Sequence, residues 1–138
     1  LGPSGKIEQL YDRLRDWSAQ HGLLGEPEVR RALGRVRTMV RLNELLNWQV
    51  AASGETIAVA DAAATKVFST ERIQEVGRLA EEVVGRYGNP ADPETGRLLD
   101  WLDKMTKRNL VITFGGGVNE VMREMIAASG LKVPRVPR

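Results

Sequence analysis

Apolar residues recur at intervals of three and four positions through most of this 138-residue chain. That spacing places them on one face of a helix, because an α-helix completes a turn every 3.6 residues. Glycine and proline interrupt the pattern between segments. The chain is therefore expected to form helices over residues 6–21, 26–53, 55–84, 93–110 and 118–129.

Each expected helix has one apolar face that must be buried against a neighbouring helix. Because the connections are short, the pattern predicts an all-α fold, an antiparallel four-helix bundle with an additional short C-terminal helix. The core should be mainly aliphatic, with the three tryptophans as anchors. The residues expected to point inward or extend the apolar surface include Ile7, Leu10, Tyr11, Leu14, Trp17, Val29, Leu33, Val36, Val40, Leu42, Leu45, Leu46, Trp48, Val50, Ile73, Val76, Ala80, Val83, Leu98, Trp101, Leu102 and Met105.

Two connections stand out from the helical pattern. Residues 111–114 (VITF) are β-prone, but they are too short and isolated to form a sheet, so we expect an extended connector there. Residues 85–90 (GRYGNP) break the third helix sharply, which is typical of a helix C-cap followed by a turn.

Composition and charge narrow the possible classes of protein. The chain is 42% hydrophobic and 28% charged, which is typical of a single globular domain. Its 20 Lys+Arg and 18 Asp+Glu residues are too balanced to indicate a nucleic-acid partner. No apolar run approaches the roughly 20 residues of a membrane span, so no membrane association is expected. The absence of cysteine excludes disulfides and is compatible with the reducing cytoplasm, which is the expected location.

The three consecutive glycines at positions 115–117 are the most informative candidate for chemistry. Glycines before a helix allow backbone N–H groups to approach an anion, and the helix N-terminus adds a favourable dipole. A phosphate, a pyrophosphate or a thioester carbonyl would suit this arrangement. Local sequence alone leaves a flexible hinge as the stronger alternative. No Lys-Ser/Thr pair follows the glycines, so they do not form a P-loop.

Other titratable residues indicate no separate site. His21 is the only histidine, and its position at a helix end favours a capping or surface role over metal binding. Glu82, Asp100 and Asp103 do not form an acid/base pair by spacing. The sequence alone therefore predicts no metal centre and no complete catalytic constellation.

Several motifs, in order along nearly the whole chain, resemble the C-terminal domain of the acyl-CoA dehydrogenase family. The terminal motif is similar to VITFGGGVNEVMREMIAASGLKVPR, and a central helix of the family is similar to EPEVRRALGRVRTMVRLNELLNWQVA. Residues 64–66 (ATK) resemble the lysine-bearing start of the next helix. The segment EEVVGRYGNPAD resembles the family loop usually written Q-x-x-GG-x-G.

The resemblance implies that residues 1–138 are the last third of a three-domain enzyme whose N-terminal and middle domains lie outside this chain. It further implies FAD as cofactor, an acyl-CoA thioester as substrate and an acyl-CoA dehydrogenase subunit, like or unlike, as partner. In the family reaction a glutamate removes the α-proton while flavin N5 accepts the β-hydride. The positions that match the family's flavin-contacting motifs are Glu82, Gly85, Arg86, Gly115, Gly116, Gly117, Val118 and Glu120.

This chain departs from the family pattern at four of those positions. The catalytic glutamate that many members carry in the terminal motif falls on Gly116, which offers no base. The threonine that follows is Val118, the loop glutamine is Glu82, and the second loop glycine is Arg86. These departures indicate that FAD is bound only in the intact oligomer, as in bacterial relatives, including steroid-degrading ones, in which two unlike subunits share one flavin site.

Two alternative functions remain open from the sequence. The first is a catalytically inactive subunit that only supports an active partner. The second is a free-standing helical interaction module. The sequence upstream of residue 1 would decide among the enzyme and these two alternatives. A glutamate facing the flavin would favour the enzyme over the inactive subunit. Missing N-terminal and middle domains would favour the interaction module.

Overall fold

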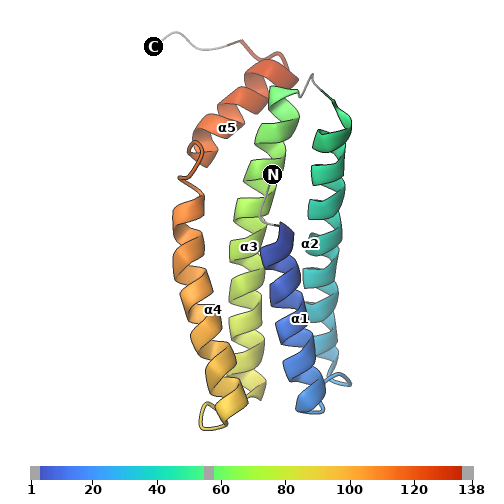
Figure 1. Ribbon diagram of the computed structural model, residues 1–138, viewed down its shortest axis with the longest axis vertical. Helices are drawn as coiled ribbons and strands as arrows, with labels where there is room; N and C mark the ends of the chain where they lie inside the picture. The colour runs from blue at the N-terminus through green and yellow to red at the C-terminus, as the bar shows by residue number, and fades with distance from the viewer. Residues whose placement is uncertain (1–3, 55–57, 135–138) are drawn as a thin grey trace.

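The computed structural model describes residues 4–54 and 58–134, and every regular element in these ranges is helical. Four antiparallel helices form the bundle, and a short fifth helix crosses its upper end (Figure 1). The elements are α1 (Ser4–Gln20), α2 (Pro27–Ala52), α3 (Val59–Tyr87), α4 (Pro93–Ile112), α5 (Asn119–Met125) and a π-helical turn η1 (Ile126–Gly130). The structure confirms the predicted all-α bundle and the predicted short C-terminal helix.

Most helix ends lie close to the proline, glycine and capping residues that interrupt the apolar pattern of the sequence. α2 and α4 each begin with a proline in the first turn, where the missing N–H leaves no bond unmade. Asp92 caps α4 by accepting a 2.9 Å hydrogen bond from the backbone N–H of Thr95. The expected start of the third helix falls on residues 55–57, which lie outside the described residues. α3 ends at Tyr87, three residues later than expected.

The predicted extended connector is wrong. Val111 and Ile112 form the last turn of α4, and the N–H of Phe114 bonds to the carbonyl of Val111. Two β-branched residues at the end of a 20-residue helix cost little, because each adds a backbone hydrogen bond to a helix that already exists. The connection from α4 to α5 is therefore only residues 113–118, which we call the glycine loop.

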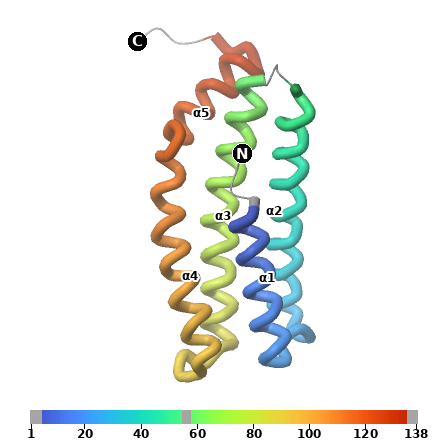
Figure 2. Tube along the Cα trace, viewed as in Figure 1, coloured from blue at the N-terminus to red at the C-terminus, as the bar shows by residue number. Residues whose placement is uncertain are grey.

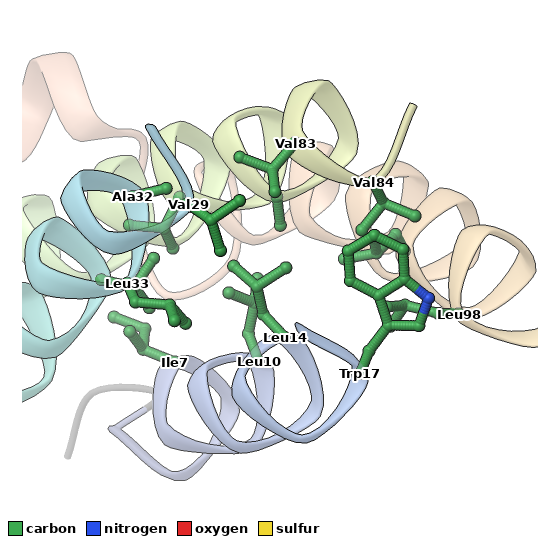
Figure 3. Packing of buried hydrophobic residues seen from close by; sticks show 14 of the residues in the cluster. Ile7, Leu10, Leu14, Trp17, Val29, Ala32, Leu33, Val83, Val84 and Leu98 are labelled. Atoms are coloured by element: carbon green, nitrogen blue, oxygen red, sulfur yellow. The ribbon is translucent and has the colours of Figure 1, made fainter. Parts of the chain in front are cut away.

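The core lies between the four long helices and is mainly aliphatic. Ile7, Leu10 and Leu14 of α1 are at most 1% exposed and pack against α2 and α3 (Figure 3). The other fully or largely buried apolar side chains include Trp17, Val29, Leu33, Val36, Val40, Ile73, Val76, Ala80, Val83, Val84, Leu98 and Leu102. These buried positions confirm the predicted helical stripes.

Trp48 does not anchor the core, contrary to the expectation from its spacing. Its side chain is 73% exposed, and Leu42 and Leu45 on the same helix are 41% and 57% exposed. Trp101 is partly buried, and the guanidinium of Arg13 lies 4.6 Å from the centre of its ring. α1 lies beside only the lower part of α2, so the upper part of α2 lacks a neighbour on that side (Figure 2).

Candidate functional site

The glycine loop is held against α3 by the ammonium group of Lys66. Lys66 Nζ donates to the carbonyl oxygen of Thr113 at 3.1 Å, to that of Gly117 at 2.5 Å and to Asn119 Oδ1 at 2.6 Å. Partial burial lowers the pKa of Lys66, and the negative charges of Glu120 and Glu71 oppose this shift. The loop is thus tied to α3 at both ends, which argues against a freely moving hinge.

Asn119 links the start of α5 to the same region of α3. Its side chain is 4% exposed, and its amide nitrogen donates to Thr70 Oγ1 at 3.1 Å and to Glu71 Oε1 at 3.2 Å. Glu71 also accepts from Arg123 at 2.6 Å. The oxygen of the same amide accepts from Lys66. Asn119 therefore connects Lys66 to Thr70 and Glu71, and the loop lies on a connected polar network instead of on apolar contacts alone.

Two of the three glycines have backbone conformations that L-residues rarely adopt. Gly116 has φ +72° and Gly117 has φ +108°, both in the left-handed region. A Cβ on Gly117 would lie 2.4 Å from the terminal methyl carbon of Met122, whereas a Cβ on Gly116 would meet nothing within 4 Å. In the described part of the chain, the N–H groups of Gly115, Gly116 and Gly117 have no hydrogen-bond acceptor. The loop therefore offers unpaired donors with open space beside Gly116.

The remaining terminal-motif positions surround this loop. Val118 precedes α5 and is 36% exposed, and Glu120 lies in the first turn of α5 with its side chain exposed. α5 has only seven residues before it passes into the π-helical turn. The structure thus brings together all five terminal-motif residues that the sequence singled out.

The second predicted cluster lies at the opposite end of α3. Lys66 and Gly85 are nineteen positions apart on one continuous helix, which corresponds to roughly 28 Å at 1.5 Å per residue. Glu82, Gly85 and Arg86 are all exposed there. Arg86 forms an ion pair with Glu28 of α2 and so turns toward α2. Within one chain, the two predicted clusters do not form one site.

Glu28 organises the local structure around Arg86. Tyr87 Oη donates to Glu28 at 3.0 Å, and the hydrogen bonds from Arg86 and Tyr87 lower the pKa of Glu28. Glu28 lies in the first turn of α2, where a negative charge is favourable. The guanidinium of Arg86 is thus hydrogen-bonded to Glu28, and it interacts with Glu82 only through the attraction of the two charges.

His21 has the capping role that its position suggested. Its Nδ1 donates to the carbonyl oxygen of Trp17 at 2.8 Å, and its Nε2 donates to Asp92 Oδ2 at 3.0 Å. These two bonds raise the pKa of His21, and bonds from Thr95 and His21 lower the pKa of Asp92 to about 2. The network closes through Trp17 Nε1, which donates to Thr95 Oγ1 at 3.0 Å. This arrangement joins the end of α1 to the start of α4.

Sequence reasoning missed Lys66 and Asn119 as parts of the site. From the sequence, Lys66 was only part of the motif that resembles the lysine-bearing helix of the family, and no role was predicted for Asn119. Their contacts join positions 47 to 53 residues apart, and no local pattern specifies such pairs. The available signal was a single lysine within an alanine-rich stretch of helix (ADAAATKVF).

Large apolar side chains are exposed mainly on the later parts of α2 and α4 and near the glycine loop. They include Leu42, Leu45, Trp48, Leu110, Val111, Phe114, Val118 and Val121. Exposed apolar surface of this kind commonly marks association with another protein surface. No described helix has the length and apolar character needed to cross a membrane. Across residues 4–54 and 58–134, no group of three or more His, Asp or Glu side chains is arranged to hold a metal ion.

Comparisons with solved structures give the same fold. A chain of the ChsE4–ChsE5 complex from Mycobacterium tuberculosis matches with a TM-score of 0.82 and 32% identity, covering 99% of this chain and 38% of that one. A chain of the Tcur3481–Tcur3483 steroid ACAD, an acyl-CoA dehydrogenase, matches with a TM-score of 0.81 and 34% identity, covering 96% and 35%. Both solved structures are complexes of two different proteins.

Sequence comparisons extend this likeness to specific relatives. FadE29, an acyl-CoA dehydrogenase of Mycobacterium tuberculosis strain H37Rv, is 66% identical over 143 aligned residues, covering 100% of this chain and 37% of that protein. FadE26 of the same organism is 38% identical over 122 residues, covering 84% and 30%. This chain spans about a third of the length of these curated relatives. The family model of the acyl-CoA dehydrogenase C-terminal domain matches residues 2–131, and the chain therefore belongs to the acyl-CoA dehydrogenase family as its C-terminal domain.

Proposed function

We propose that this domain completes the flavin and acyl-CoA site of an FAD-dependent acyl-CoA dehydrogenase subunit, which catalyses α,β-dehydrogenation of an acyl-CoA thioester. Members of the family use FAD, which accepts the hydride when bound. The full-length protein would supply the N-terminal and middle domains. The domain's own contribution is to present backbone donors from the glycine loop and to associate with a neighbouring subunit.

One observation carries this proposal. The N–H groups of Gly115, Gly116 and Gly117 have no acceptor in the described structure, while the loop around them is fixed by Lys66. Fixed, unpaired backbone donors beside open space suit an oxygen of a phosphate or thioester. The exposed carboxylate of Glu82 suits an anionic ligand poorly, so we assign the fit to the glycine loop and not to the residue 82–86 cluster.

The geometry also favours a site built between subunits. The two family motifs lie roughly 28 Å apart along one helix, so their contacts with flavin would be made with two different flavin molecules. Gly116 provides no side chain for proton abstraction, so the base must come from upstream in this protein or from the partner. We propose an unlike dehydrogenase subunit as the partner and a steroid-derived acyl-CoA as the substrate, as the heteromeric steroid ACAD structures suggest.

Anaerobic titration of the full-length protein, co-purified with its partner subunit, tests this function. We expect bound FAD in the complex and loss of its absorbance near 450 nm when a steroid-derived acyl-CoA is added. The 138-residue domain alone should retain no flavin and show no turnover, because most of the site lies outside it. A complex that binds FAD but is not reduced by any acyl-CoA would favour a supporting subunit without catalysis.

A further inference from the structure

Lys66 uses its full hydrogen-bonding capacity on the glycine loop and on the first residue of α5. An ammonium group has three protons, and three acceptors surround this one: the carbonyl oxygens of Thr113 and Gly117 and the side-chain oxygen of Asn119. Both carbonyls belong to the loop, at its two ends. A side chain from the middle of the domain thus sets the backbone of a loop about 50 residues away.

The direction of those carbonyls fixes two peptide groups, the one between Thr113 and Phe114 and the one between Gly117 and Val118. The N–H of Phe114 already bonds to the Val111 carbonyl, so the N–H of Val118 is the loop donor that Lys66 orients directly. In a trans peptide the C=O and the following N–H point in opposite directions. Because the Gly117 carbonyl points toward Lys66, the N–H of Val118 points away from it. Gly117 has φ +108°, one of the several conformations that glycine adopts without strain, so its own preference does not select this one. The bond from Lys66 to the Gly117 carbonyl is the polar contact best placed to select it.

We propose that Lys66 is a positioning residue, which holds both ends of the glycine loop and orients the peptide group between Gly117 and Val118 so that the N–H of Val118 faces the flavin or thioester. This inference rests on the proposed function of the loop. Asn119 and Glu71 support Lys66, because Asn119 accepts from the ammonium and donates to Glu71. Lys66 acts through the loop and does not itself touch the reacting atoms.

Variants of Lys66 in the full-length complex test this role. Lys66→Met keeps the length and the aliphatic stem but removes all three donors. We expect flavin retention or acyl-CoA affinity to fall at least about tenfold, since a 1.4 kcal/mol loss already corresponds to that factor. The visible circular dichroism of any remaining flavin should change, and the far-ultraviolet signal should stay near wild type. Lys66→Gln, which keeps an amide donor, should give an intermediate effect.

Arg123→Gln provides the matched control. It removes the 2.6 Å bond between α5 and Glu71 without removing any bond to the loop carbonyls. We expect it to lower the melting temperature slightly and to leave flavin content, flavin spectrum and acyl-CoA KM unchanged.

Three results would overturn the assignment of Lys66. The first is a Lys66→Met complex that has the wild-type flavin spectrum and acyl-CoA KM and differs only in melting temperature, as the control does. The second applies if Lys66→Met does not fold: it is a Lys66→Gln complex with the wild-type flavin spectrum and acyl-CoA KM and a change in melting temperature only. The third is failure of both variants to assemble, which would make Lys66 a folding residue. Failure of the proposed function is distinguishable, because the wild-type complex itself would then show no reduction by acyl-CoA.

Discussion

Valine at position 116 is expected to remove flavin or acyl-CoA binding from the assembled enzyme while leaving its helices intact. Gly116 lies between α4 and α5, so no helix is interrupted. No atom of residues 4–54 or 58–134 outside the immediate neighbours lies within 4 Å of the added Cβ, so the side chain would enter the open space that we assign to the ligand. We expect at least about a tenfold loss of retained flavin or of acyl-CoA affinity, which corresponds to about 1.4 kcal/mol or more.

Gly22→Val is the control for backbone strain in that experiment. Gly22 has φ +68°, close to the +72° of Gly116, and its Cβ would also meet nothing within 4 Å. Each variant should lose about 1–2 kcal/mol because an L-residue is forced into the left-handed region. Gly22 lies in the turn after α1, away from the glycine loop, so its variant should keep normal flavin content. Equal flavin content and acyl-CoA affinity in both variants would show that the loop is only a structural connection.

Alanine at position 88 is expected to cause the largest loss of stability from adding a single methyl group. A Cβ on Gly88 would lie 2.6 Å from the Val84 carbonyl oxygen, 2.7 Å from Thr95 Cγ2 and 2.9 Å from Trp17 Cζ2. The backbone oxygen and the buried indole cannot both move away easily. The same indole donates to Thr95 in the network that joins α1 to α4. We expect the free energy of unfolding to fall by about 1–3 kcal/mol or more.

Chemical denaturation of the isolated bundle measures this effect, because its core is formed by its own helices. Gly85→Ala is the matched control, three residues earlier on α3, where an added Cβ meets nothing within 4 Å. That change should raise the stability by about 0.5–1 kcal/mol, because alanine is the better helix former. A Gly88→Ala bundle as stable as wild type would contradict the close packing of α1, α3 and α4 at this end.

The helices and the core were predictable because burial imposes a period on the sequence. Ile7, Leu10 and Leu14 occupy one face at that period, and all three are buried. Trp48 also lies on an apolar helix face but is exposed. The spacing of apolar residues identifies such a face but does not say whether it packs within this chain or against another. The end of α4 was mispredicted because local β-propensity was given more weight than the extension of an existing helix.

The candidate site was predictable only in part, for a different physical reason. Consecutive glycines stand out locally, so positions 115–117 could be singled out from the sequence. Lys66 and Asn119 acquire their roles from contacts across about 50 residues, and only the folded chain brings these groups together. Arg86 likewise finds its hydrogen-bonding partner in Glu28, 58 residues away, and it interacts with Glu82 only through the electrostatic attraction of the two charges.

The position of the glycine loop relative to bound FAD tests the central claim most directly. The measurement is an experimental structure of the full-length protein with its partner subunit, FAD and an acyl-CoA analogue. The account predicts that at least one N–H of residues 115–118 lies about 2.7–3.2 Å, nitrogen to oxygen, from a flavin or thioester oxygen. It also predicts that Lys66 retains its bonds to the loop carbonyls. A holo complex in which this loop contacts neither ligand would contradict the claim that this domain lines the active site.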